Sequence, residues 1–225
     1  MSFLELLQQS LPMFMTGMQL TLELSFISLI IAMFIGLGSC LMNISKVRVL
    51  HWISQCYINI IRGTPLLVQT FFIYFGVTKA LGFSMTALTA GIVALSLNAG
   101  AYLSEIFRGG IEAVPHGQME AARSLGMPYH SAMLKIILPQ ALRIVVPSIV
   151  NQCIITIKDT SIISVIGLAE LTMMGSQIIA RTFRSFEIWL CVGALYFIVI
   201  YLLTKLSKYV EKRLSLVKGA DRKPA

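Results

Sequence analysis

The sequence predicts an all-α integral membrane protein with five transmembrane helices. Of its 225 residues, 56% are hydrophobic and only 12% are charged, whereas about a quarter of the residues in an ordinary soluble domain carry charge. The mean hydropathy is +0.81. Several apolar runs are long enough to cross a bilayer core of about 30 Å. A single transmembrane domain over residues 1–225 is therefore expected.

Three of the five expected spans are uninterrupted apolar runs, namely Leu20–Leu41, Thr86–Phe107 and Phe186–Thr204. The other two, 58–78 and 140–157, contain polar residues or proline. The polar side chains of span 140–157 must face protein or water, because lipid offers them no partner.

Span 58–78 is the least regular of the five. Pro65 either opens a helix at its first position, with Thr64 as the N-cap, or kinks a longer helix. Arg62 is expected to anchor this span by reaching the lipid headgroups with its long side chain.

The basic residues predict the orientation of the chain. Most of the 18 Lys and Arg residues follow the first, third and fifth expected spans. Because basic residues are enriched in cytoplasmic loops, the N-terminus is expected outside and the C-terminus in the cytoplasm. The net charge of +8 thus reflects membrane topology, and no nucleic-acid partner is expected.

Polar residues mark one face of the span Thr86–Phe107. Asn98, Tyr102 and Glu105 follow i, i+4 and i+7 spacing, which places them on one side of a helix. Asn98 lies roughly 18 Å from the outer end, and its amide can both donate to a carboxylate and accept from an ammonium group. We interpret this face as substrate-binding, with helix–helix hydrogen bonding as the alternative. For Glu105 the alternative is an ion pair with Arg108.

A second polar group lies in and after the fourth expected span. Its candidate substrate-binding residues are Asn151, Asp159, Thr160 and Ser161. Charged groups at membrane depth are functional candidates, and Asp159 is suited to bind a substrate ammonium. The alternative is that Lys158 and Asp159 belong to a capping cluster where a new helix starts.

The expected segment 109–139 between the third and fourth spans contains the stretch EAARSLGMPYHSAMLKIILP, which starts at Glu120. The pattern predicts a short helix that Gly126 ends in the left-handed conformation, followed by a second helix from Pro128. The two helices would lie along the membrane surface. Ala121 and Ala122 would leave one face nearly flat, which suits docking into a partner's groove; a plain interfacial loop is the alternative.

This stretch resembles the cytoplasmic signature of ABC importer permeases, which is E-A-A, three residues, G, nine residues and I-x-L-P. Three further motifs resemble the polar amino-acid subfamily of these permeases. They are RGTPLLVQ (62–69), LNAGAYLSEIFRGGI (97–111) and IKDTSIISVIGLAELT (157–172). The resemblance extends from about residue 16 to 213, and within the subfamily the region after Asn151 looks most like glutamine permeases.

The resemblance implies the type I ABC importer permease fold, with a cytoplasmic coupling helix, in a bacterial inner membrane. It implies a pair of permease subunits, as a homodimer or with a sister permease, and two cytoplasmic ATPase subunits. Glu120, Ala121, Ala122 and Gly126 would couple to the ATPase. A periplasmic or lipid-anchored binding protein would deliver a polar amino acid, with glutamine favoured.

The resemblance also implies that ATP and Mg²⁺ act only in the partner ATPase. The chain has no G-x-x-x-x-G-K-[ST] motif, so no nucleotide site of its own is expected. Its histidines lack metal-ligand spacing and no nucleophile–base group appears, so no metal, cofactor or enzymatic activity is expected either. The alternative is an ion-coupled carrier or channel without an ATPase partner. Such a carrier would have no use for a docking helix.

Overall fold

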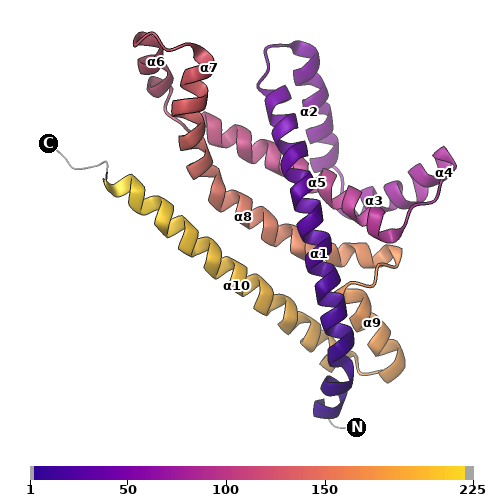
Figure 1. Ribbon diagram of the computed structural model, residues 1–225. Helices are drawn as coiled ribbons and strands as arrows, with labels where there is room; N and C mark the ends of the chain where they lie inside the picture. The colour runs from indigo at the N-terminus through magenta and orange to yellow at the C-terminus, as the bar shows by residue number, and fades with distance from the viewer. Residues whose placement is uncertain (1–2, 221–225) are drawn as a thin grey trace.

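The computed structural model describes residues 3–220, and within this range the chain forms helices and short turns without a β-strand (Figure 1). The predicted all-α class is therefore confirmed. The α-helices are α1 (Phe3–Asn43), α2 (Arg48–Arg62), α3 (Leu66–Phe71), α4 (Thr78–Leu81), α5 (Ala87–Glu112), α6 (His116–Ser124), α7 (Tyr129–Ala132), α8 (Leu138–Ile163), α9 (Leu171–Thr182) and α10 (Ser185–Ala220). Short helical segments of other types are η1 (Phe72–Val77), η2 (Met133–Ile137) and η3 (Ser164–Ile166).

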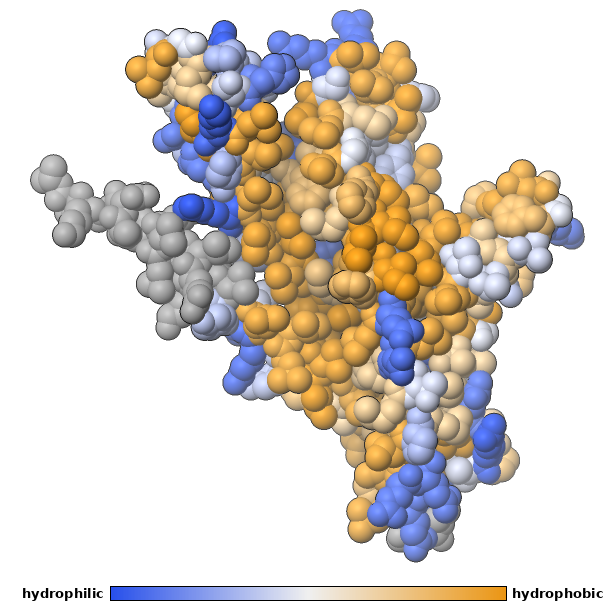
Figure 2. Space-filling model, viewed as in Figure 1, coloured by the Kyte–Doolittle hydropathy of each residue, from blue (hydrophilic) through white to orange (hydrophobic). Residues whose placement is uncertain are grey.

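Within the described residues, four helices are long and apolar enough to cross a membrane. They are Phe3–Asn43, Ala87–Glu112, Tyr129–Ile166 and Ser185–Tyr209. A fifth crossing results if α2 and the helix from Leu66 to Leu81 count as one span bent by 106°. In Figure 2 apolar residues cover most of the middle of the molecule, and hydrophilic residues gather toward its ends.

The first helix is much longer than the expected span Leu20–Leu41. It begins at Phe3, and its 41 residues correspond to roughly 60 Å, about twice the thickness of a bilayer core. Its first half buries Leu6, Phe14 and Met18 in a cluster with residues of α9 and α10. Tertiary packing therefore extends this helix through the polar residues and Pro12 that interrupt the apolar run.

The expected second span 58–78 straddles the bend between α2 and the helix from Leu66. Of the two alternatives for Pro65, a new helix does open there, with Pro65 in place of Thr64 as its N-cap. α2 ends at Arg62, and α3 begins at Leu66 with Pro65 as its N-cap. Pro65 has no N–H to donate back to α2, and its ring disfavours helical geometry in the preceding residue. The chain therefore turns at residues 63–65 before it continues.

The connection between the third and fourth spans is shorter than the expected segment 109–139. α5 continues to Glu112, and α7, η2 and α8 run on as one helix. The predicted second helix does begin after Pro128, which is the N-cap of α7, but it continues into the fourth span and is not a separate surface helix. Pro139 does not break this helix, because the π-helical turn η2 just before it shifts the backbone hydrogen bonds, and Leu138 N donates to Met133 O.

α1 and α5 cross closely and form the centre of the bundle. Ala32 and Cys40 of α1 share a buried cluster with Leu103 and Phe107 of α5. A Cβ added to Gly36 would lie 2.8 Å from Leu103 Cβ and 3.0 Å from the Gly100 carbonyl oxygen. The absence of a side chain at Gly36 therefore sets how near the two backbones approach.

Replacing Gly36 with alanine is expected to destabilise the protein by about 1–3 kcal/mol, because the added methyl group overpacks the crossing. Gly38, on the same helix, is the matched control, since a Cβ there would have nothing within 4 Å. Gly38→Ala should be neutral or gain up to about 1 kcal/mol from helix propensity. The measurement is thermal unfolding of both variants in detergent, and equal unfolding temperatures would contradict the close crossing.

Candidate functional site

A polar cavity of about 350 Å³ lies where the bend after α2 faces α5 and α8. This volume falls within the range of about 300–1,000 Å³ that is usual for small-molecule sites. Asn98 lies near the middle of α5, so the cavity is near the middle of that span. The lining residues are Thr64, Pro65, Leu66, Asn98, Tyr102, Gln152, Ile155 and Asp159.

Gln69 on α3 holds the wall of this cavity in place. Its Nε2 lies 2.7 Å from Ile61 O and 2.9 Å from both Thr64 O and Thr64 Oγ1. These carbonyl groups belong to the broken end of α2 and would otherwise lack partners in an apolar setting. Gln69 Oε1 in turn accepts a hydrogen bond from Asn98 Nδ2 at 3.2 Å. One side chain thus closes the break and orients Asn98.

The structure brings three of the predicted substrate residues together. Asn98, Tyr102 and Asp159 all line the cavity, although α5 carries the first two and α8 the third. Asn98 is also hydrogen-bonded to another helix, as the alternative for that residue expected, while its substrate-binding role stays a prediction. Two polar cavity residues, Thr64 and Gln152, were not predicted as site residues, although Gln152 directly follows the predicted Asn151.

The other predicted residues of α8 do not line the cavity. Asn151 is exposed elsewhere on the helix surface. Thr160 is fully buried and its hydroxyl donates to Ile157 O at 2.7 Å, while Ser161 donates to Lys158 O at 2.7 Å. α8 continues through all of these positions, so the alternative of a helix that starts near Asp159 is wrong.

Glu105 pairs with Arg108 and does not line the cavity. Arg108 Nε lies 3.1 Å from Glu105 Oε1, and its Nη2 lies 2.8 Å from Oε2, which makes a bidentate ion pair. Arg108 Nη1 also binds both carboxylate oxygens of Glu112 at 2.7 Å. The alternative reading of Glu105 is therefore confirmed.

Arg62 lies against α5 and has protein partners there. Its guanidinium carbon is 5.4 Å from the centre of the Tyr102 ring, and its Nη1 is 3.5 Å from Glu105 Oε2. Arg62, which was expected to reach the lipid headgroups, is thus held over Tyr102 next to the cavity by a cation–π contact. Its side chain remains 43% exposed.

The predicted short helix of the connecting segment is α6, and its end is a Schellman motif. Met127 N donates to Ala122 O at 3.1 Å and Gly126 N to Arg123 O at 3.0 Å. Gly126 has φ +82°, the left-handed conformation that favours glycine, as predicted.

The expected flat alanine face is only half present on α6. Ala122 is 2% exposed and packs toward the helical bundle, whereas Glu120 and Ala121 are exposed. The outward surface of α6 is therefore formed by Glu120 and Ala121, and Ala122 lets the helix lie close to its own chain. In Figure 1, α6 and α7 lie at the end of the molecule opposite the N-terminus.

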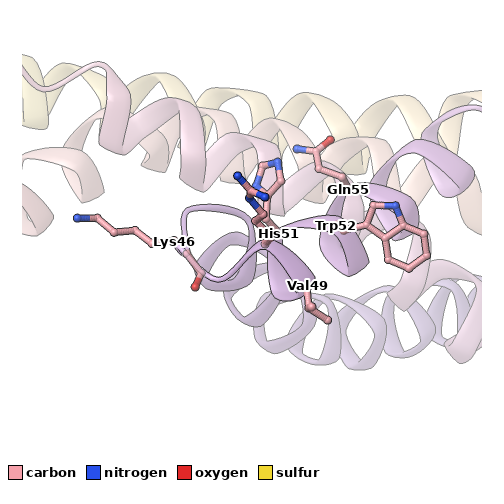
Figure 3. A pocket seen from close by; sticks show the side chains of 7 residues that line it. Lys46, Val49, His51, Trp52 and Gln55 are labelled. Carbon is pink, nitrogen blue, oxygen red and sulfur yellow. The ribbon is translucent and has the colours of Figure 1, made fainter.

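Two other hollows lack convergent polar groups. One, of about 650 Å³, lies at the turn between α1 and α2, and Figure 3 shows its labelled side chains pointing in different directions, with Lys46 directed away from the rest. His51 and Gln55 in that hollow are already hydrogen-bonded to Asn43. The other, of about 400 Å³, is lined by apolar residues of α1, α5 and α8 and Cys40. Neither arrangement suits a polar ligand.

Residues 39–216 match the family described as binding-protein-dependent transport system inner membrane component. The chain belongs to this family. It is therefore a multi-pass permease subunit of a transport system that works with a separate binding protein.

Individual relatives match over nearly the whole chain. The arginine transport system permease protein ArtQ of Bacillus subtilis (strain 168) is 39% identical over 204 residues, covering 91% of this chain and 93% of that protein. The glutamine transport system permease protein GlnP of Escherichia coli (strain K12) is 36% identical over 209 residues, covering 92% and 95%. A crystal structure of an amino acid ABC transporter with histidines superposes with a TM-score of 0.91 at 40% identity, covering 95% of this chain and 99% of that chain. The resemblance inferred from the four motifs is confirmed.

This permease also has a buried carboxylate that the sequence did not single out. Glu170 is fully buried at the N-cap of α9, where its Oε1 accepts from Met173 N at 2.8 Å. Its Oε2 accepts from the Tyr196 hydroxyl of α10, also at 2.8 Å. Burial raises the pKa of the Glu170 carboxyl above its ordinary value, although these hydrogen bonds act in the opposite direction.

Glu170 is expected to make the permease less stable as the pH rises. Because the folded protein holds this proton more tightly than the unfolded chain, the stabilisation is complete below the ordinary pKa of 4.5 and is lost as pH rises through the folded pKa. Glu170→Gln should therefore flatten the fall in unfolding temperature as the pH rises above 4.5. Glu120→Gln, at an exposed position, is the control. An unchanged slope in Glu170→Gln would contradict the assignment.

Proposed function

We propose that this permease forms the path for a polar amino acid in an ATP-driven importer, with the cavity beside Asn98 as the substrate site. The supporting observation is that an amide, a phenol and a carboxylate face one cavity within an apolar bundle. A zwitterionic amino acid needs such groups because hydrocarbon cannot solvate its charges.

Asn98 and Asp159 have complementary roles in this proposal. The Asp159 carboxylate binds the substrate ammonium, and the Asn98 amide donates to or accepts from the substrate. Relatives named for arginine and for glutamine support the class of polar amino acids. Glutamine is the substrate that we favour, from the motif resemblance.

The outward surface of α6 docks on a cytoplasmic ATPase. This surface carries Glu120 and Ala121 at the end of the molecule away from the N-terminus. ATP and Mg²⁺ bind in that ATPase, and two ATPase subunits serve a pair of permeases, formed by two copies of this chain or by this chain and a sister permease. Closure of the ATPase pair moves the two α6 helices together and opens the path on the opposite side.

The chain lies with its N-terminus outside and its C-terminus in the cytoplasm. The basic residues of the α1–α2 turn, of α6 and of η2 support this orientation, because such residues gather on the cytoplasmic side. A periplasmic or lipid-anchored binding protein then delivers substrate to the end of the bundle that carries α9.

Reversing the charge of Glu120 is expected to uncouple transport. Glu120→Lys should lower ATP-driven uptake by roughly tenfold or more in proteoliposomes, because loss of a charged contact costs about 1.5–3 kcal/mol. Membrane insertion should be unchanged. Gln118→Lys is the matched control, since Gln118 is exposed as well but lies one turn of α6 before Ala122, on a different side of the helix from Glu120. Uptake by Glu120→Lys at the unaltered rate would contradict docking through this surface.

Asn98→Ala, which removes the amide, is expected to weaken substrate binding by roughly tenfold, the equivalent of about one hydrogen bond. Asn151→Ala, on the exposed surface of α8, should bind substrate normally. The measurement is binding of radiolabelled L-glutamine and L-arginine to the purified permease–ATPase complex. Equal losses in the two variants would argue against the cavity as the substrate site.

A further inference from the structure

We infer that Arg62 binds the α-carboxylate of the transported amino acid, while Asp159 holds the ammonium group in the same cavity. This inference rests on the proposed function and adds a residue that determines specificity. It concerns the charged group that every α-amino acid shares, so it holds whichever polar side chain is transported.

The guanidinium of Arg62 lies over the ring of Tyr102, one of the residues that line the cavity. Arg62 is the last residue of α2, and the turn that follows supplies the lining residues Thr64 and Pro65. Its guanidinium carbon stands 5.4 Å from the ring centre of Tyr102, which also lines the cavity. The bend after α2 and the Tyr102 ring together hold this cation beside the space that Asp159 faces.

The contact with Glu105 leaves N–H groups of Arg62 available to bind a ligand. Arg108 already binds both oxygens of Glu105, at 3.1 Å and 2.8 Å. Arg62 approaches the same carboxylate only to 3.5 Å, beyond the usual range of about 2.7–3.2 Å for an N–H···O hydrogen bond. Its side chain is 43% exposed, which leaves N–H donors available to a ligand.

The chemistry of the two charged groups fits the two ends of an α-amino acid. A guanidinium offers paired N–H donors that match the two oxygens of a carboxylate, whereas an ammonium acts as a point charge. The cation of Arg62 and the anion of Asp159 come from different helices, α2 and α8. A zwitterion oriented between them would have its side chain free to contact the remaining cavity wall.

The test compares each amino acid with its α-amide, which keeps the ammonium and the side chain but has no carboxylate. The protein is the complete permease–ATPase complex in lipid nanodiscs, without the binding protein, because that protein would add its own selectivity. The probes are L-glutamine, L-arginine and their α-amides, measured by isothermal titration. The variants are Arg62→Gln and Arg62→Lys, with Arg48→Gln as the control because it removes the same charge at the other end of α2.

The unaltered complex should bind the acid roughly tenfold or more tightly than the α-amide, as expected for a charge-assisted bidentate contact. Arg62→Gln should abolish this ratio while leaving affinity for the α-amide almost unchanged, and Arg62→Lys should restore only part of it. Arg48→Gln should keep the full ratio.

Two results would overturn the inference, and they are distinguishable. If Arg62→Gln weakened acid and amide equally, or preserved their ratio, Arg62 would have a structural or gating role instead. If the unaltered complex bound neither L-glutamine nor L-arginine, the proposed substrate class itself would fail, and the inference with it.

Discussion

A helix that breaks inside an apolar bundle must satisfy its exposed carbonyl groups, and the rest of this permease depends on how it meets that constraint. Gln69 does so by reaching back from α3 to the carbonyl groups of Ile61 and Thr64. Because the same amide accepts a hydrogen bond from Asn98, closing the break also fixes a cavity side chain. The turn itself supplies cavity wall and places Arg62 over Tyr102. The contacts that satisfy the backbone carbonyl groups at the break therefore also position the side chains beside the cavity.

The parts of the site that follow from local spacing could be predicted from the sequence. Asn98 and Tyr102 are four residues apart in a long apolar run, so any helix there must place them on one face. Gly126 follows a short polar helix and precedes proline, and this pattern fits the left-handed residue that ends α6. Asp159 is a charged residue within an apolar span, and burying such a charge in lipid is costly, so it marks a position that faces a partner, water or a ligand.

The remaining features depend on contacts between distant segments, which spacing alone does not specify. Pro65 was compatible with either a kink or a helix start, and the hydrogen bond between Gln69 and the distant Asn98 helps to hold the 106° bend that forms there. The burial of Ala122 arises from packing of α6 on its own chain, so two adjacent alanines acquire different roles. α9 is a short helix that packs on α1 and α10. α1 lies more than 100 residues away in the chain, and the contacting residues of α10 lie about 15 residues away.

The unbroken helix from Tyr129 to Ile166 has a mechanical consequence. It crosses α5 at Val145, where a Cβ on Gly110 would approach to 2.0 Å, so this contact is tight enough to serve as a fulcrum. Tyr129, next to the tip that follows α6, is roughly 24 Å from that point, and Asp159 is roughly 21 Å beyond it. A helix that rotates about this contact, with arms of almost equal length, turns a push at one end into an opposite swing of similar size at the other. The carboxylate would therefore travel about as far as the tip does.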